Sequence, residues 1–182
     1  TAPRYSNQRV GIFIDVQNLY HSAKNLYHGR VNYTELMKHL VGDRQLIRAM
    51  AYVVKSEGVE PQHSERMTAR LRPARSEENG TGESSSSEAD LQIYAGGMKK
   101  ADWDVGMAVD AIRMSAFLDV IILVTGDGDF LPLVDYLKWG AGRLVEVAAF
   151  RRSASSKMQE AADRFINIED IPRAIMKSRA ER

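Results

Sequence analysis

VIILVTGDGDF, at residues 120–130, begins with an unbroken apolar run and ends with two aspartates, Asp127 and Asp129, which are spaced by glycines. Such a run is typical of a strand that is buried on both faces of a parallel sheet. A second apolar run, at residues 10–14, leads directly into Asp15. Because the carboxyl ends of neighbouring parallel strands open on one crevice, we expect the three carboxylates to share a site.

The rest of the chain alternates between strand-like and helical segments. Further strand-like runs lie at residues 47–54, 91–94, 144–150 and 165–168. Near the end, the sequence Asp-Ile-Pro at residues 170–172 is a typical start for a last helix. The alternation of strands and helices predicts an α/β sandwich.

Two helices have clear sequence signals. Asn32 followed by Glu35 forms a capping box, which predicts a helix over residues 33–40. A second helix is predicted from an apolar stripe with i, i+3, i+4 and i+7 spacing, formed by Val105, Ala108, Val109, Ile112 and Ala116. Met107 and Met114 lie off this stripe. They either line the contact surface of a homodimer or pack inside the protein, as methionine commonly does.

Composition excludes several classes of function. The 182 residues carry 25 Lys and Arg against 24 Asp and Glu, so that the net charge of +1 gives no global sign of nucleic-acid or membrane binding, and any basic surface must be local. The absence of cysteine excludes disulfides, thiolate zinc sites and a cysteine nucleophile. With no segment resembling a signal peptide or a membrane span, we expect a cytoplasmic protein.

One segment breaks the alternation of strands and helices. Residues 76–90, SEENGTGESSSSEAD, are polar and contain no apolar residue larger than alanine, which predicts a disordered loop. A linker between two domains is the competing interpretation, but each flanking part would lack the strands for its own sheet. We therefore predict a single domain over residues 1–182, with this loop as an insertion.

The aspartates that follow the two strands have a structural and a chemical interpretation. Aspartate is a favoured N-cap residue, so Asp129 can cap the next helix. Capping by Asp129 does not explain why a second aspartate, Asp127, is present. Two carboxylates this close repel each other unless a cation neutralises them, and Mg²⁺ prefers oxygen ligands. Beyond Asp15, Asn18 either caps the following helix or positions a water or a phosphate oxygen with its amide.

A third acidic cluster lies in KKADWDVGMAVD, residues 99–110. Either Asp102 or Asp104 is a suitable cap for a helix that starts near Val105, and a cap can also be a metal ligand. Asp110 lies away from the apolar stripe and either pairs with Arg113 or supports the site.

Three motifs, FIDVQNLYHSAK, KKADWDVGMAVDA and ILVTGDGDFLPLVDYLKWGAGRLVEV, together resemble those of the NYN domain family, which includes LabA-like proteins and is related to PIN-domain nucleases. RSASSKMQEAADRFINI is similar to the closing segment of the family. The resemblance implies a PIN-like, three-layer α/β/α sandwich around a central, mostly parallel sheet of five to six strands. Residues 65–90 depart from the family pattern of a helix, a turn with Gly and an aromatic residue, and a strand.

The resemblance also implies a divalent-metal site formed by Asp15, Asp104, Asp127 and Asp129, with RNA, in single-stranded form, as the substrate. Phosphodiester hydrolysis needs an activated water and neutralised phosphoryl oxygens, which carboxylate-held Mg²⁺ or Mn²⁺ supplies. We therefore predict a metal-dependent ribonuclease. We assign catalytic or metal-holding roles to those four aspartates and to Asn18, and supporting roles to Asp110 and Thr125.

We expect RNA phosphates to bind to local cations and to the N-terminus of a helix. The candidate RNA-binding residues are Lys99, Lys100, Arg151, Arg152, Ser155, Ser156 and Lys157. Such groups can hold a phosphate backbone without reading bases, although charged loops are usually only solvated.

Two other functions remain open from the sequence. One is a non-catalytic module that binds RNA or protein and keeps the acids for structure. The other is a phosphatase-like enzyme with an aspartyl nucleophile, which is disfavoured because Asp15 is followed by Val16 and Gln17 and so lacks a second acid.

Overall fold

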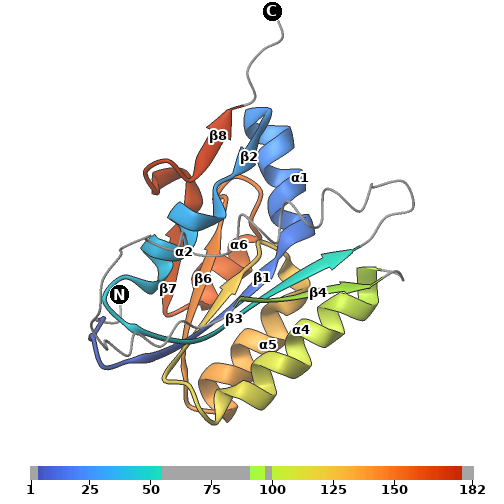
Figure 1. Cartoon of the computed structure of the whole chain (residues 1–182). Helices are drawn as coiled ribbons and strands as arrows, with labels where there is room; N and C mark the ends of the chain where they lie inside the picture. Colours follow the sequence, from blue (N-terminus) through green and yellow to red (C-terminus); the bar gives the residue numbers. More distant parts are fainter. Residues whose placement is uncertain (1–3, 55–90, 97–99, 178–182) are drawn as a thin grey trace, which may run out of the picture.

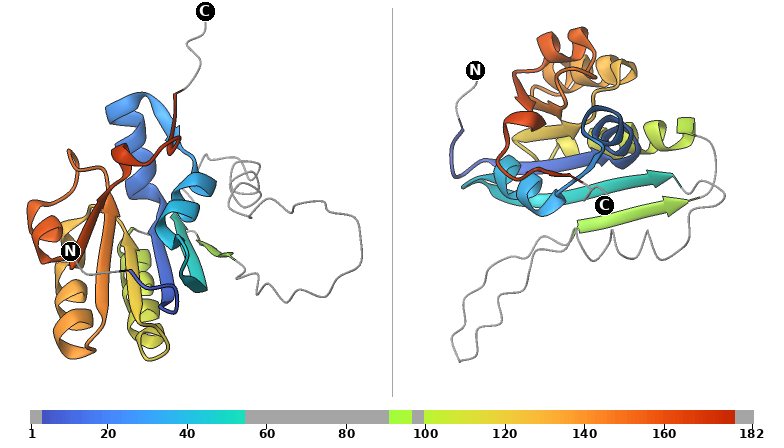
Figure 2. Two further views of the ribbon diagram at one scale, coloured as in Figure 1. Left: turned by 90° about the vertical axis from the view of Figure 1, so that its left-hand side faces the viewer. Right: turned by 90° about the horizontal axis from the view of Figure 1, so that it is seen from above.

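The computed structural model describes residues 4–54, 91–96 and 100–177 (Figure 1). Its centre is a six-stranded sheet in the order β4-β3-β1-β5-β6-β7, in which every neighbouring pair is parallel. These strands are β1 (Arg9–Asp15), β3 (Gln45–Val54), β4 (Leu91–Gly96), β5 (Val120–Val124), β6 (Leu144–Ala149) and β7 (Arg164–Asn167). Figure 2 shows β4 beside β3 at one edge of the sheet. The predicted α/β fold and its parallel sheet are confirmed.

Helices cover both faces of the sheet, as the three-layer prediction requires. They are α1 (Val16–Tyr27), α2 (Tyr33–Val41), α4 (Lys100–Ser115), α5 (Leu131–Asp135) and α6 (Ser156–Ala161), with helical turns η1 (Gly128–Phe130), η2 (Tyr136–Gly140) and η3 (Ile168–Asp170). Figure 1 shows α4 and α5 together on one side of the strands. The predicted start of α2 is confirmed, because the Asn32 side chain accepts a hydrogen bond from the Glu35 backbone N–H at 3.4 Å. The reciprocal bond of a capping box does not form, since the Asn32 backbone N–H donates to the Ala174 carbonyl oxygen at 2.7 Å.

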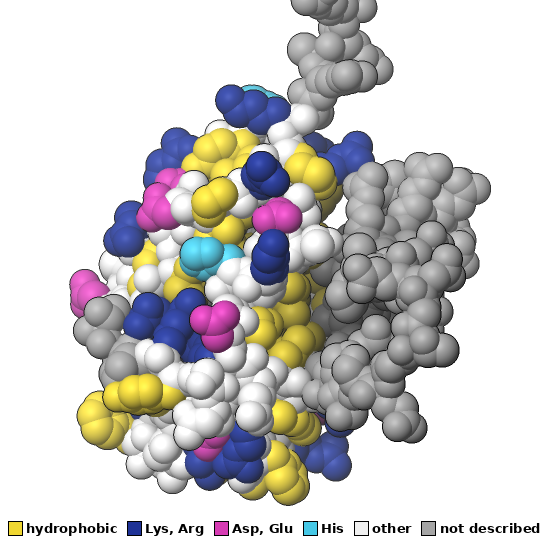
Figure 3. All heavy atoms as spheres, turned by 60° about the vertical axis from the view of Figure 1, so that its left-hand side comes forward, with side chains coloured by type: hydrophobic (Ala, Val, Ile, Leu, Met, Phe, Trp, Pro, Cys, Tyr) yellow, Lys and Arg dark blue, Asp and Glu magenta, His cyan; other side chains and the backbone are white. Residues whose placement is uncertain are grey.

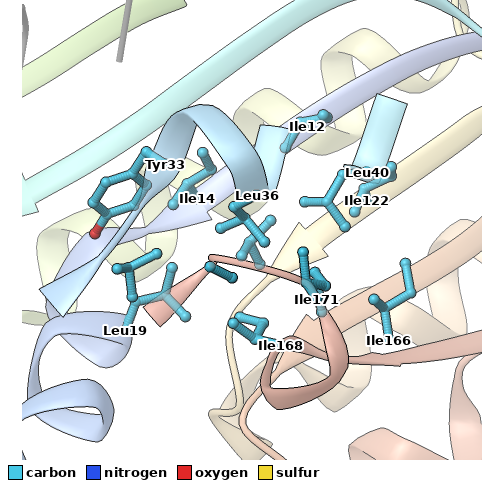
Figure 4. Packing of buried hydrophobic residues seen from close by; sticks show 14 of the residues in the cluster. Ile12, Ile14, Leu19, Tyr33, Leu36, Leu40, Ile122, Ile166, Ile168 and Ile171 are labelled. Carbon is cyan, nitrogen blue, oxygen red and sulfur yellow. The ribbon is translucent and has the colours of Figure 1, made fainter. Parts of the chain in front are cut away.

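Alternate residues of the strands fill two cores. On β1, Ile12 and Ile14 point to the core shared with α1 and α2, which Figure 4 shows from close by. Phe13, between them, belongs to the opposite core, which also contains Met107 of α4 and Leu133 of α5. Burial of the sheet on both faces explains why its strands are continuous apolar runs in the sequence.

The helix predicted after residue 170 is wrong. Instead, β8 (Ile175–Lys177) pairs antiparallel with β2 (Gly29–Val31) in a separate two-stranded sheet. Arg173 has a positive φ of 61°, which turns the chain directly after Pro172 and prevents a helix from continuing there. Neither strand was predicted, because strands this short depend on a distant partner rather than on a local pattern.

The core-facing side of α4 was also predicted wrongly. Met107 and Ala111 are buried against the sheet, with 1% and 0% of their surface exposed. The predicted stripe faces outward, with Val105, Val109 and Ile112 63%, 43% and 39% exposed. Because both sides of α4 are apolar, periodicity detects a helix but does not tell which side meets the sheet. The methionine Met107 therefore belongs to the core and not to a dimer face.

The disordered loop that the sequence predicts at residues 76–90 lies outside the described residues. Among the described helices, none combines the length and the apolar character that a membrane-spanning helix needs.

Candidate functional site

Asp15 ends β1 and is 7% exposed. One of its carboxylate oxygens, Oδ1, accepts a hydrogen bond from the Asn18 backbone N–H at 3.0 Å and so caps α1. The other, Oδ2, accepts a hydrogen bond from the Thr125 hydroxyl at 3.1 Å. Thr125 follows β5, the neighbouring strand, so the structure joins the ends of β1 and β5 at this point.

Asn18 does not cap α1, because Asp15 takes that position. The side-chain oxygen of Asn18 instead accepts a hydrogen bond from the Gly126 backbone N–H at 3.0 Å. A Cβ atom at Gly126 would lie 2.9 Å from Cα of Ala154, so only glycine fits between the two loops. Asn18 therefore fastens the loop after β5 to the first turn of α1.

Asp127 is linked to Asp15 through Thr125. The Asp127 backbone N–H donates to the Thr125 hydroxyl oxygen at 3.2 Å, and the same hydroxyl donates to Asp15. The Asp127 side chain caps η1 by accepting a hydrogen bond from the Asp129 backbone N–H at 3.0 Å. The predicted capping role of Asp129 thus belongs to Asp127, and Asp129 itself is exposed.

The two acids that were predicted as caps of α4 lie inside the helix. The helix begins at Lys100, so neither Asp102 nor Asp104 precedes its first turn. Asp104 is half-buried and comes one turn before Met107, on the side of α4 that faces the sheet. Asp110 accepts a hydrogen bond from the Tyr52 hydroxyl at 2.8 Å, a contact that ties α4 to β3.

Sequence reasoning did not include Tyr33 in the site. This residue opens α2 and is 8% exposed. Burial raises the pKa of the Tyr33 hydroxyl, and the negative charge of Asp15 raises it further. Tyr33 therefore stays neutral and forms part of the apolar wall behind Asp15, a contact between segments that no local pattern could reveal.

A groove lined mostly by polar residues runs along α1. It has a volume of about 550 Å³ and is lined by Gln17, Asn18, His21, Ser22, Asn25, Leu26 and Ser153. Its two walls are joined by a hydrogen bond from the Ser153 hydroxyl to the Ser22 hydroxyl at 2.9 Å. Apart from Asn18, this lining was not predicted, although polar residues at i, i+4 and i+8 on α1 were a visible signal.

The predicted cations after β6 mostly contact other side chains. Arg152 pairs with Glu169 at 3.2 Å and lies over the ring of Tyr27, while Arg151 lies over the ring of Phe165. On the face drawn in Figure 3, basic side chains are scattered among acidic and apolar ones.

The remaining predicted RNA contacts divide into two groups. Ser155 lies near the site, because a Cβ atom at Gly128 would be 3.1 Å from its hydroxyl oxygen, while Ser156 and Lys157 are exposed at the start of α6. Lys99 lies outside the described residues, and only the backbone of Lys100 is described.

A divalent metal needs oxygen ligands, which the acids at this edge of the sheet can supply. Among the described residues, no three Asp, Glu or His side chains lie together as a metal-binding group. Mg²⁺, however, is usually held by only one or two protein carboxylates and keeps several waters beside substrate phosphates. Asp15 and Asp127, joined through Thr125 at one edge of the sheet, fit such an open site rather than a closed protein cage.

Comparison with known proteins extends these findings. Residues 9–169 match the family model of the NYN domain. A crystal structure of a protein of unknown function from Vibrio parahaemolyticus RIMD 2210633 is similar to this chain, with a TM-score of 0.72 and 23% sequence identity, over 96% of this chain and 100% of that chain. No curated protein matches. The structural likeness supports the fold.

Proposed function

The chain belongs to the NYN domain family, which is generally one of nucleases, and we propose that it hydrolyses RNA phosphodiester bonds with Mg²⁺ or Mn²⁺. One observation carries this proposal, the hydrogen-bonded series from Asp15 through Thr125 to Asp127 at the carboxyl ends of β1 and β5. In open parallel sheets, ligands bind outside these strand ends.

The chemistry of Asp15 supports a cation at this edge. A carboxylate that is 7% exposed loses most of its hydration, and a nearby cation offsets that loss. Asp15 and Asp127 would hold the metal, while Asp104 from α4 and Asp129 from η1 would complete its surroundings. A bound Mg²⁺ would neutralise phosphoryl oxygens and lower the pKa of an attacking water.

The protein's own part is to keep the acids in place. The Thr125 hydroxyl donates to the Asp15 carboxylate and accepts from the Asp127 backbone N–H, while Asn18 holds the backbone of Gly126 between them. Such supporting hydrogen bonds fix carboxylate ligands in one orientation, and their loss commonly costs about tenfold to a hundredfold in activity or metal affinity. Asp110 supports the site indirectly, through Tyr52.

The groove along α1 offers a place for the nucleotide next to the cleaved bond. Its lining carries amide, hydroxyl and imidazole groups, which can form hydrogen bonds with a ligand. These groups suit a ribose and a base of a single strand more than a phosphate. Phosphates would lie against Arg151, Arg152 and Lys157, with the Ser155 and Ser156 hydroxyls and Lys99 and Lys100 as further contacts.

The test is cleavage of an end-labelled, single-stranded RNA with Mg²⁺, with Mn²⁺ and with a chelator. Asp15→Asn and Asp127→Asn keep side chains that can cap a helix but remove the charge, and we expect each to lower the rate by about 100-fold or more. The matched control is Asp119→Asn, because Asp119 lies at the opposite end of β5, where it pairs with Arg9. We expect the control to cleave like the wild type.

Two results would contradict the proposal. A wild-type rate no higher than that of the two site variants would show that cleavage comes from a contaminant. Binding of RNA without cleavage, unchanged by Mn²⁺, would instead favour a non-catalytic binding module of the same fold. A single-stranded DNA of the same sequence, run in parallel, shows whether the substrate class is RNA.

A further inference from the structure

The groove along α1 contains a buried hydrogen-bond acceptor without a partner. Gln17, in the first turn of α1, lines the groove, and its side-chain oxygen Oε1 is buried. Among the described residues, no group donates a hydrogen bond to this oxygen. Buried polar atoms in folded proteins are nearly always paired, so an exception beside an open groove indicates a donor that arrives with a ligand.

This acceptor lies close to the candidate metal site. Gln17 is two residues after Asp15 and directly before Asn18, which also lines the groove. The Asn18 backbone N–H donates to the Asp15 carboxylate, and the Asn18 side chain accepts from the Gly126 backbone N–H. The first turn of α1 therefore joins the groove to the edge of the sheet where Asp15 lies.

The chemistry of this oxygen restricts what can bind to it. An amide oxygen only accepts hydrogen bonds, and the ionised phosphates of a nucleic acid are also acceptors, so a phosphate does not pair with it. A nucleotide carries donors in two places, the ribose 2′-hydroxyl and the N–H groups of the base. The 2′-hydroxyl is the nearer of these to the phosphate, because it is on the carbon next to the one that carries the 3′-phosphate.

The rest of the groove suits the uncharged part of a nucleotide. Among the described residues of its lining there is no Lys or Arg, which would attract a phosphate. Leu26 offers an apolar contact for a sugar or a base, and the hydroxyls of Ser22 and Ser153 bond to each other at 2.9 Å. The volume of about 550 Å³ has room for one nucleoside beside Gln17.

We propose that Gln17 Oε1 accepts a hydrogen bond from the 2′-hydroxyl of the nucleotide at the cleaved bond, and so makes the protein prefer RNA to DNA. This inference rests on the proposed function, because it takes the edge at Asp15 as the position of the phosphate. The 2′-hydroxyl is the group that distinguishes RNA from DNA. A site that pairs with a substrate hydroxyl rejects the analogue that lacks it, because the polar group of the site then stays unpaired.

The test is binding of three fluorescent single-stranded oligonucleotides of one base sequence, namely RNA, DNA and 2′-fluoro RNA, at one salt concentration and with a chelator. The chelator prevents metal-dependent cleavage and removes any cation that the oxygen could bind instead. A 2′-fluorine is close in size to a hydroxyl but cannot donate a hydrogen bond. We expect the wild type to bind RNA about tenfold more tightly than either analogue, which is the effect of about one hydrogen bond.

Gln17→Met keeps the length and the helix propensity of the side chain but removes its amide. We expect this variant to bind RNA only as tightly as the wild type binds DNA, with its affinity for DNA unchanged. The matched control is Gln45→Met, the same substitution of an exposed glutamine at the start of β3, at the opposite end of the sheet from Asp15. The control should keep the preference for RNA. Circular dichroism shows whether each variant is folded.

The inference is overturned if the wild type does not prefer RNA, if 2′-fluoro RNA binds as tightly as RNA, or if Gln17→Met keeps the preference. It is also overturned if Gln17→Met weakens all three oligonucleotides equally, since the oxygen would then bind a base or have a structural role. Cleavage is judged separately. A protein that prefers RNA through Gln17 but cuts nothing would contradict only the nuclease function, and one that cuts RNA but binds RNA and DNA equally would contradict only the role of Gln17.

Discussion

Two buried carboxylates in this protein are held in different ways. Glu146 on β6 is 5% exposed and accepts hydrogen bonds from Arg44 at 3.0 and 2.9 Å and from Arg4 at 3.4 and 3.2 Å, with Arg164 at 3.6 Å. Asp15 on β1 is 7% exposed, and its two oxygens accept hydrogen bonds from the Asn18 backbone N–H at 3.0 Å and from the Thr125 hydroxyl at 3.1 Å.

The two carboxylates therefore differ in the groups that the structure places around them. The arginines neutralise Glu146 within the protein and join the ends of several chain segments. The Asn18 N–H and the Thr125 hydroxyl orient Asp15 at the end of β1. Burial raises the pKa of the neighbouring Tyr33, and the charge of Asp15 raises it further. An oriented carboxylate at a strand end is suited to a cation that arrives with a substrate.

The largest expected effect is a loss of stability when Glu146 loses its charge. Glu146→Gln leaves the buried guanidinium of Arg44, whose side chain is only 2% exposed, without its anion. Removing one partner of a buried ion pair commonly costs about 3 kcal/mol or more, so we expect that loss in the free energy of unfolding measured with urea.

Glu160→Gln, on the exposed side of α6, is the control for Glu146→Gln and should change the free energy of unfolding little. RNA cleavage per folded molecule should be the same in both variants. If Glu146→Gln is as stable as the wild type, the cluster does not have the structural role assigned to it.

The second prediction concerns binding of a metal ion at Asp15. Mg²⁺ should raise the melting temperature of the wild type but not that of Asp15→Asn, because only the charged site binds the ion. The stabilisation is about 2.7 kcal/mol when the ion is present at about 100 times its dissociation constant. Differential scanning calorimetry with and without Mg²⁺ measures it, and an equal shift in both proteins would place the ion elsewhere.

A smaller effect is expected from the hydroxyl that joins the two acids. Thr125→Val keeps the shape of the side chain but removes the hydrogen bonds to Asp15 and from the Asp127 N–H. We expect the cleavage rate to fall by roughly tenfold, as is common for residues that orient metal ligands. Thr125→Ser keeps the hydroxyl and should keep most of the rate. Equal rates for the valine and serine variants would show that orientation by this hydroxyl does not matter.

The smallest effect concerns a charge pair at the surface. Hydrogen bonds from Arg9 lower the pKa of Asp119 to about 2. Because the folded-state pKa lies below the unfolded value, this stabilisation is complete above about pH 4 and is lost as the pH falls toward 2. The pair is exposed, so the effect should be small. Urea unfolding of Asp119→Asn should show a slightly flatter pH dependence there, and an unchanged slope would contradict the assignment.

Much of the fold could be predicted from residues alone. The buried strands were visible because apolar runs such as residues 10–14 and 120–124 are needed on both faces of a parallel sheet. The meeting of Asp15 with the TGDGD loop also followed, because parallel neighbours end at one edge. The inner face of α4 could not be chosen, since Met107 and Val109 are both apolar and only the packed sheet distinguishes them.

The details of the site depend on contacts between distant segments. Asp and Asn are both good helix caps, so the sequence could not decide that Asp15 caps α1 and that Asn18 instead binds the backbone of Gly126. The bridging role of the Thr125 hydroxyl depends on the register of β1 and β5. The burial of Tyr33 beside Asp15 depends on how α2 packs.

The central claim is that a metal ion held at Asp15 and Asp127 acts on the scissile phosphate. The most direct measurement replaces one nonbridging oxygen of that phosphate with sulfur and compares cleavage in Mg²⁺ and in Mn²⁺, since the softer Mn²⁺ accepts sulfur more readily. The account predicts slow cleavage of the sulfur-substituted RNA in Mg²⁺ and recovery in Mn²⁺, relative to the unmodified RNA. Equal rates for the two RNAs in Mg²⁺, or cleavage that survives a chelator, would contradict it.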